Sequence, residues 1–335
     1  MQKCVPVVDS DQNPLMPTAW RRAMKWIKSG KATPFWKRGV FCVRLNQEPS
    51  GRVLQDITIG IDPGSKKEGI TVKSASHTFL NIQMDTVTWV KEAKETQRNL
   101  RRSRRYRKTP CRRNKQNRSR GGIPPSTKAR WGWKLRICFW LQKMFPISSF
   151  VVEDLKAQTK KGKKRWNISF SPLEIGKQWF YKELEEKIAP VILKEGWETK
   201  ELRDSLGLKK TSRKLSETFD AHCVDSWVLS WSQVGGSKIP NNTDILFITP
   251  IRFHRRQLHL QNPSKGGIRK RYGGTMSWGF KRGSLVRHPR VGLSYVGGFQ
   301  KDRISLHNLK DGKRFGQNFY PSDCQFLSYN SWRVH

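Results

Sequence analysis

Residues 57–64, ITIGIDPG, place a carboxylate at the end of a hydrophobic strand pattern. Ile at alternate positions predicts a β-strand with one buried face, and Asp-Pro-Gly predicts a turn that begins at Asp62. Two further strand patterns follow at residues 69–72 and 79–82, so the three segments together predict a β-meander. A buried carboxylate is costly unless it is paired or bound to a cation, so Asp62 is either a turn former or part of a site.

Two later segments carry acids in comparable positions. The apolar run 150–152 predicts a strand that ends at Glu153, and an amphipathic helix that starts near Ser216 carries His222 and Asp225 on one face. Each position alone also fits an ordinary strand end or helix surface. Together they match two-metal phosphodiester hydrolysis, in which carboxylates hold two Mg²⁺ ions about 3.5–4 Å apart and a His can take the proton of the attacking water.

The chain is strongly basic, with 66 Lys and Arg against 26 Asp and Glu, a net charge of +40 and a pI of about 10.6. This excess is far beyond what solubility requires and predicts a nucleic-acid partner. Its densest part, residues 91–120, lies between two predicted structured segments, which favours an ordered helix over a disordered tail. Four arginines have the spacing of one helix face, ahead of Pro110, which ends or kinks the helix: Arg98, Arg101, Arg102 and Arg105.

The rest of the pattern predicts an α/β protein. Residues 1–52 form a small αβ unit, and amphipathic helices are predicted at 128–145 and 174–192. A strand at 245–248 is followed by short β patterns broken by glycine, which predict a barrel-type β domain over residues 241–335.

Two common classes of protein are not expected. No window approaches the roughly 18 apolar residues of a membrane span, and the N-terminus lacks the apolar core of a signal peptide, so we expect a cytoplasmic protein. The six cysteines lie far apart without a Cys-x-x-Cys pair, so we expect free thiols and no zinc.

Three motifs resemble, in order, the three segments of the RuvC-like nuclease fold: IGIDPGSKKEGITV (59–72), FVVEDL (150–155) and DAHCVDSWVLSW (220–231). The sequence PLMPTAWRRAMKWIKSGKA near the N-terminus, the Arg-rich helix and the segment RRQLH…KGGIRKRYGGT extend the resemblance over essentially the whole chain. In this combination the chain resembles the IscB/IsrB group, transposon-encoded RNA-guided nucleases that are the ancestor group of CRISPR single-effector nucleases.

One departure distinguishes the members of this group. IscB proteins carry an HNH nuclease domain between the second and third RuvC segments, and such a domain needs histidines. This chain has no histidine between His77 and His222, and the connecting segment, residues 155–221, is short for one that holds an inserted domain. The chain therefore resembles IsrB, the variant without HNH.

The resemblance implies a RuvC/RNase H-like mixed sheet with flanking helices, interrupted by an Arg-rich bridge helix and flanked by an N-terminal PLMP domain and a C-terminal β-rich, barrel-like domain. The implied domains are PLMP at 1–52, RuvC segment I at 53–92, the bridge helix at 93–127, RuvC segments II and III at 128–240, and the target-adjacent-motif-interacting domain at 241–335.

The resemblance also implies an activity, an Mg²⁺-dependent DNA endonuclease that nicks one strand. A structured guide ωRNA pairs with the target strand of double-stranded DNA next to a short target-adjacent motif, and the RuvC centre hydrolyses the non-target strand. The implied assembly is a monomeric protein in a ribonucleoprotein that acts at the prokaryotic nucleoid.

Individual roles follow from the same resemblance. Asp62, Glu153 and Asp225 hold two Mg²⁺ ions, for which Mn²⁺ can substitute, and His222 positions or deprotonates the attacking water. The implied RNA-binding residues are Arg98, Arg101, Arg102, Arg104, Arg105, Arg112 and Arg113. The implied DNA-binding residues are Lys265, Arg269, Lys270 and Arg271.

Three other functions stay open at the level of sequence. A guide-free resolvase of RuvC type needs neither the PLMP segment, nor the long basic helix, nor the C-terminal β domain. A TnpB-like nuclease is disfavoured because its zinc-binding insertion needs Cys-x-x-Cys pairs. A non-catalytic RNA-binding scaffold predicts that the acids are incidental.

Overall fold

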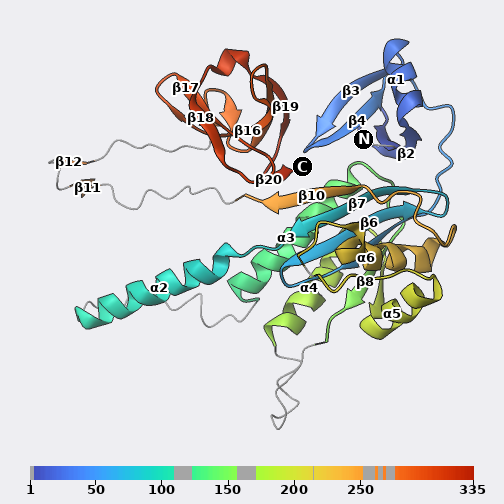
Figure 1. Ribbon diagram of the computed structural model, residues 1–335, viewed down its shortest axis with the longest axis horizontal. Coiled ribbons are helices and arrows are strands. Elements are labelled where there is room, and N and C mark those ends of the chain that lie inside the picture. Colours follow the sequence, from blue (N-terminus) through green and yellow to red (C-terminus); the bar gives the residue numbers. More distant parts are fainter. Residues whose placement is uncertain are drawn as a thin grey trace, which may run out of the picture.

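The computed structural model describes residues 4–108, 123–156, 171–213, 215–251, 261–262, 267–268 and 276–335. Within these residues a seven-stranded mixed sheet with flanking helices forms the body of the molecule (Figure 1). The N-terminal segment forms a small αβ unit beside it, and a five-stranded antiparallel sheet is built from the C-terminal part of the chain. The predicted α/β class with a mixed sheet is confirmed.

The N-terminal unit is a four-stranded sheet in the order β2-β1-β4-β3. Its elements are β1 (Cys4–Val8), β2 (Pro14–Ala19), α1 (Trp20–Lys28), β3 (Ala32–Lys37) and β4 (Val40–Leu45). The helix buries Ala23 against the sheet, where Val5, Val7 and Val43 form a separate small core. The PLMP sequence is therefore strand β2, and the N-terminal segment is an αβ unit, as predicted.

The central sheet has the order β20-β10-β7-β6-β5-β8-β9. Its strands are β5 (Ile57–Asp62), β6 (Lys67–Ser74), β7 (Thr78–Asp85), β8 (Ser149–Asp154), β9 (Val191–Glu195), β10 (Ile245–Pro250) and β20 (Trp332–Val334). The predicted meander is confirmed as antiparallel β5-β6-β7, and β8 runs parallel to β5. Strands β10 and β20 complete one edge, so the segment 241–335 contributes to two sheets.

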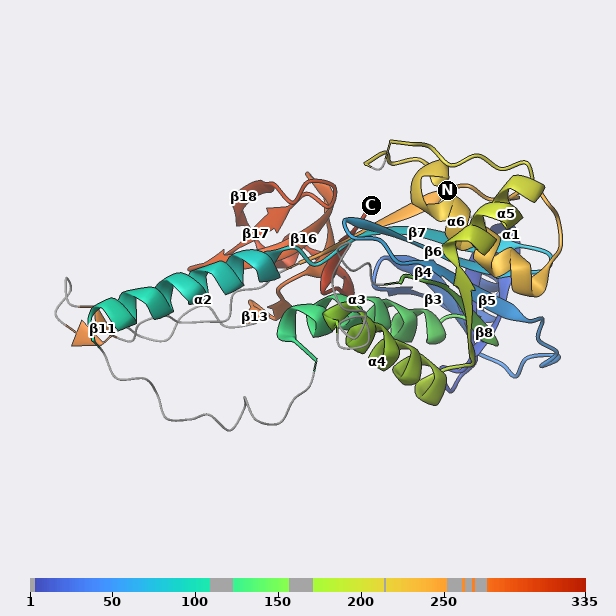
Figure 2. The same ribbon diagram turned by 90° about the horizontal axis from the view of Figure 1, so that it is seen from below.

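Helices cover both faces of this sheet (Figure 2). On one face lie α3 (Pro125–Gln142) and α4 (Pro172–Lys187), and on the other lie α5 (Gly196–Ser205) and α6 (Phe219–Val234). The isoleucines of β5 pack into the core that α3 and α4 share, while the intervening positions of β5 lie beneath α6. The prediction of a single buried face for β5 was therefore wrong, because every residue of the strand is buried.

Two glycines allow α6 to approach the sheet closely. A Cβ at Gly60 would lie 1.9 Å from the carbonyl oxygen of Ser226, and a Cβ at Gly69 would lie 2.0 Å from that of His222. Any larger residue would collide with the helix backbone. The glycine in ITIGID thus sets the depth at which α6 sits on the sheet.

The helix predictions were accurate in type but not in extent. The helix predicted over 174–192 ends at Lys187, and β9 follows Pro190, which cannot continue the helix. Helix α5 was not predicted. Helix α6 starts at Phe219 with Thr218 at its N-cap, so Ser216 is not the cap residue.

The Arg-rich segment forms α2 (Trp89–Tyr106), which extends away from the body (Figure 1). It ends before Pro110, as predicted. The segment that contains Arg112 and Arg113 lies outside the described residues.

The C-terminal sheet is antiparallel in the order β18-β17-β16-β15-β19. Its strands are β15 (Ser284–His288), β16 (Gly292–Gln300), β17 (Arg303–His307), β18 (Arg314–Phe319) and β19 (Gln325–Tyr329). Among the described strands β18 and β19 do not pair, so this sheet is not a closed barrel. Short hairpins precede it: β11 (Gln261–Asn262) with β12 (Gly267–Ile268), and β13 (Met276–Ser277) with β14 (Phe280–Lys281).

Two general properties concern the described residues alone. None of their helices combines the length and apolar character that crossing a membrane requires. Five of the cysteines are free thiols: Cys4, Cys42, Cys138, Cys223 and Cys324.

Candidate active site

Asp62 and Asp225 face each other across the contact between the sheet and α6. Asp62 is the last residue of β5, and Asp225 lies in the second turn of α6. Both side chains are buried, at 8% and 3% relative exposure. Because Gly60 and Gly69 lower α6 onto the sheet, an acid of the strand and an acid of the helix are held within the range of one cation.

In the structure, the ammonium of Lys210 is the cation that lies between Asp62 and Asp225. Its Nζ lies 3.6 Å from Asp62 Oδ2 and donates a hydrogen bond to Asp225 Oδ2. Arg203, at the end of α5, donates from Nη1 to the other oxygen of Asp225 at 2.7 Å. Asp225 is therefore fully ion-paired, and Lys210 bridges the two acids.

Glu153 belongs to the same cluster. It lies on β8, parallel to β5, and faces the start of α5, where its Oε1 would be 3.3 Å from a Cβ at Gly196. Its charge acts on Lys210 together with those of Asp62 and Asp225. Of the three predicted acids, taken from three distant segments, Asp62 and Asp225 contact Lys210, and Glu153 is near enough for its charge to raise the pKa of Lys210.

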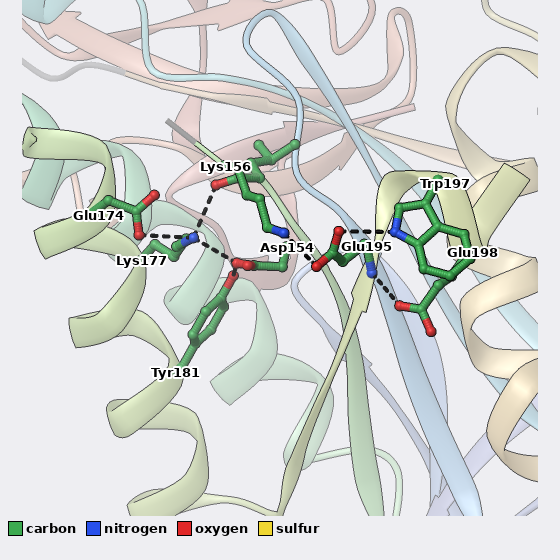
Figure 3. A network of polar contacts seen from close by, with 9 residues as sticks. Asp154, Lys156, Glu174, Lys177, Tyr181, Glu195, Trp197 and Glu198 are labelled. Carbon is green, nitrogen blue, oxygen red and sulfur yellow. Dashed lines mark hydrogen bonds and ion pairs between the residues drawn. The ribbon is translucent and has the colours of Figure 1, made fainter. Parts of the chain in front are cut away.

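The next residue, Asp154, points to the opposite side of the sheet (Figure 3). Lys177 Nζ of α4 lies 2.7 Å from Asp154 Oδ1, and Tyr181 donates its hydroxyl to the same oxygen at 3.0 Å. Successive residues of a strand point to opposite faces, so only one of the two adjacent acids can reach the cluster. The structure places Glu153 there and uses Asp154 to fix α4.

A second set of contacts fixes the start of α5 behind Glu153 (Figure 3). Glu198 accepts the backbone N–H of Glu195 at 2.6 Å, and Trp197 Nε1 donates to the Glu195 carboxylate at 2.9 Å. Lys156, just after β8, pairs with the same carboxylate. The segment just after β8 is therefore joined to the beginning of α5, next to Glu153.

The acids perturb one another. Burial raises the pKa of Asp62, an effect that Lys210 opposes and that the charge of Asp225 increases. Burial, together with the charges of Asp62 and Asp225, raises the pKa of Glu153 to about 7. Burial alone would lower the pKa of Lys210, but the surrounding carboxylates raise it. The cluster therefore favours a bound cation or a proton on Glu153.

A pocket of about 650 Å³ opens beside the cluster. Asp62 and His222 line it together with the basic residues Lys66, Lys67 and Lys210. His222 lies one turn before Asp225 on α6, as the sequence predicted. A phosphodiester in this pocket would meet the three lysines and the carboxylate of Asp62, whereas Glu153 and Asp225 do not line it.

The donor set suits a hard divalent cation, because carboxylate oxygens are the ligands that Mg²⁺ prefers. In the part of the chain that the structure describes, no group of three or more His, Cys, Asp or Glu side chains is close enough to hold a metal ion as it stands. Lys210 and Arg203 take up both oxygens of Asp225. A divalent cation would replace the positive charge that Lys210 supplies.

The predicted RNA-binding arginines lie on an exposed helix. Arg98, Arg101, Arg102 and Arg105 of α2 are exposed, and no described carboxylate forms an ion pair with any of them. Large apolar side chains of this helix are also left unpacked, since Leu100 and Tyr106 are exposed. The backbone at Arg104 is part of α2, whereas its side chain is not described.

The residues predicted to contact DNA are Lys265, Arg269, Lys270 and Arg271, and they lie outside the described residues. Sequence reasoning missed Lys210 and Arg203. Their only signal in the sequence was their place just before the helix with His222 and Asp225, in a chain rich in basic residues throughout.

A family model described as RRXRR protein matches residues 5–169, just under half of the chain. Residues 101–105 read Arg-Arg-Ser-Arg-Arg. Among solved structures, the chain is similar to T. thermophilus RuvC in complex with Holliday junction substrate, at 14% identity and a TM-score of 0.32, over 54% of this chain and 97% of that one. It is also similar to a Thermus thermophilus RuvC structure, at 14% identity and a TM-score of 0.30, over 53% and 96%. Comparison with curated proteins gave no match.

Proposed function

We propose that this chain is an RNA-guided DNA endonuclease of the RuvC-like type that nicks one strand of its target. The observation that carries the proposal is the meeting of Asp62, Glu153 and Asp225 around Lys210, at the wall of a pocket rimmed by lysines. The order of the three RuvC-like motifs supports it, as does the RRXRR family match over residues 5–169.

In this proposal the three acids hold two Mg²⁺ ions, with Mn²⁺ able to take their place. The bound ions supply Lewis-acid stabilisation of the charge that develops on the phosphate. His222 takes the proton of the attacking water from the pocket side of α6. Lys66 and Lys67 hold the DNA backbone at the pocket rim, where a strand can lie across the carboxylates.

The arginines of α2 bind phosphates of the guide RNA. Their exposure, their spacing on one face and their lack of described acidic partners all support this role. Contacts of this kind are independent of sequence and weaken with salt, so target choice rests on base pairing between guide and DNA. The contribution of Lys265, Arg269, Lys270 and Arg271 to motif recognition stays a prediction.

A single carboxylate cluster predicts a nick instead of a double-strand break. The test incubates the protein with its cognate RNA, a supercoiled target plasmid and Mg²⁺, with RNA-free and Asp62→Ala reactions beside it. RNA-dependent nicking by the wild type alone supports the proposal. RNA-independent cleavage indicates a guide-free nuclease, and no cleavage in any reaction indicates a binding scaffold. Double-strand cleavage contradicts the single centre.

A further inference from the structure

A second basic pocket lies on the side of the sheet away from the carboxylates. It has a volume of about 450 Å³ and is formed between the β3–β4 turn, the outer side of α3 and α4. Four cations line it, and Trp179 of α4 contributes an aromatic wall. The cations are Lys37, Arg38, Arg136 and Lys143. Its volume is within the range of about 300–1,000 Å³ that is usual for ligand pockets.

These cations lack the acids that normally neutralise such a group. No Asp or Glu lines the pocket, and among the described residues none of the four forms an ion pair with a carboxylate. Burial, followed by repulsion from Arg136, lowers the pKa of Arg38. The pKa of Lys37 is lowered by burial and by the charges of Lys143 and Arg38. Lys37 Nζ donates to the carbonyl oxygen of Lys143 at 3.0 Å, which holds the turn against the end of α3.

Arg38 occupies a position that favours other residues. Arg38 and Gly39 form a two-residue turn between β3 and β4, with φ of 52° and 98°. Such a turn favours Asn, Asp or Gly at its first position, because a positive φ is unfavourable for a residue with a long side chain. The guanidinium lies 4.7 Å from the centre of the Trp332 ring and so is directed toward the body. Among the described residues the guanidinium of Arg38 thus has an aromatic partner, Trp332, and no carboxylate partner.

The basic surface continues toward α2. Arg136 also lines a neighbouring pocket of about 280 Å³, together with Lys128, Trp179 and Trp89, the first residue of α2. Lys128, Gly132 and Arg136 follow one another at four-residue intervals along α3. Gly132 lies beside Trp179, whose ring would be in ordinary van der Waals contact, at 3.8 Å, with a Cβ at this position. The two pockets share Gly132, Arg136 and Trp179 and so are neighbours, and together they are called the groove below.

We propose that this groove, defined by Lys37, Arg38, Arg136, Lys143 and Trp179, binds the phosphate backbone of a single-stranded segment of the RNA, with one base against Trp179. Cations that track a backbone and an aromatic ring for stacking are the features of single-strand binding sites. This assignment rests on the proposed function, because that function makes RNA the partner.

The position of the groove assigns it to RNA and not to the DNA strand that is cut. The carboxylates lie on the α6 face of the sheet, whereas α3 and α4 cover the opposite face (Figure 2). A strand held in the groove is thus separated from Asp62 by the whole sheet. The groove also begins at the first residue of α2, so RNA bound along that helix can enter it directly.

The experiment measures binding of the full-length protein to a short mixed-sequence single-stranded RNA, and to DNA of the same sequence, over a series of salt concentrations. The variant is Arg38→Gln with Arg136→Gln. The control, Lys182→Gln with Lys200→Gln, removes the same charge from exposed positions of α4 and α5. Circular dichroism confirms that each protein is folded.

We expect the groove variant to bind RNA about tenfold more weakly at moderate salt, with its salt slope reduced by about 1.4, as for two lost phosphate contacts. The control keeps the wild-type slope. A groove variant with wild-type RNA affinity and slope overturns the assignment, whereas a similar loss for DNA of the same sequence is expected, because phosphate contacts and base stacking are common to both single strands. Wild-type protein that fails to bind any RNA instead overturns the RNA partner in the proposed function. A photo-crosslink between 4-thiouridine RNA and Trp179 supports the assignment independently of the substitutions.

Discussion

Lys210 Nζ lies 3.6 Å from Asp62 Oδ2, and the same ammonium donates to Asp225, so one lysine from the loop after α5 joins a strand acid to a helix acid. This ammonium has the charge and the position that a divalent cation needs. Under the proposed function, Lys210 competes with a divalent cation for the same carboxylate oxygens.

Lys210→Gln removes this competitor. We expect the variant to bind Mn²⁺ about tenfold more tightly than the wild type, equivalent to ~1.4 kcal/mol, because no ammonium has to be displaced. Isothermal titration calorimetry of the metal-free protein measures the change directly. Lys209→Gln is the matched control, since its side chain is exposed and forms no described contact with the acids. Weaker Mn²⁺ binding by Lys210→Gln contradicts the competition.

Glu153 offers a test that depends on pH. Its pKa of about 7 in the folded protein lies above the ordinary Glu value of 4.5, so the unfolded chain binds fewer protons between those two pH values. The ionisation of Glu153 therefore lowers the free energy of unfolding. This loss of stability is absent below pH 4.5, grows through that interval and is complete above about pH 7. We expect Glu153→Gln to raise the melting temperature by a few degrees at alkaline pH and to lose this gain at acid pH. A gain that is independent of pH contradicts the burial of this carboxylate beside two others.

The close contact of α6 with the sheet is tested at Gly69. Gly69→Ala places a methyl group where the carbonyl oxygen of His222 lies, so α6 must move away, at a cost of about 1–3 kcal/mol. We expect lower stability in urea unfolding and weaker Mn²⁺ binding, because Asp225 moves away from Asp62. Gly51→Ala is the control, since nothing lies within 4 Å of its added Cβ. Wild-type metal affinity in Gly69→Ala would show that the helix position is not critical.

A buried ion pair supports the strand next to Asp62. Lys134 of α3 and Glu68 at the start of β6 lie 2.7 Å apart, at 4% and 1% side-chain exposure. Lys134→Met leaves Glu68 buried without its partner and is expected to destabilise the protein by about 3–5 kcal/mol. Lys134→Met combined with Glu68→Leu is expected to recover most of that loss. If the double variant is as unstable as the single variant, the pair has another structural role.

The sequence predicted those parts of the protein that depend on local pattern. The strand that ends at Asp62 and the helix that carries His222 and Asp225 follow from hydrophobic periodicity, and the strand before Glu153 follows from the apolar run 150–152. The acids were visible because each ends a strand or shares a helix face with a His. The approach of α6 to β5 depends on Gly60 and Gly69, whose role becomes clear only once the helix lies on them.

Other features depend on long-range contacts that no local pattern encodes. The five residues of β9 follow a helix after a short turn, and their apolar positions merge with the helical pattern, so the helix was predicted too far. Strand β10 pairs with β7 and β20, which are both far from it in the sequence. Lys210 has many basic neighbours in sequence, and only the folded chain shows which lysine reaches Asp62.

The two adjacent acids at the end of β8 give the most direct test of the carboxylate cluster. RNA-programmed nicking of a supercoiled plasmid is measured with Glu153→Gln and with Asp154→Asn. Glu153 faces Asp62 and Asp225, whereas Asp154 is bound by Lys177 and Tyr181 on the other face. We predict that Glu153→Gln lowers the nicking rate by at least about a thousandfold and that Asp154→Asn keeps a rate within about tenfold of the wild type. Equal rates for the two variants, or a greater loss in Asp154→Asn, would contradict the assignment of the catalytic centre.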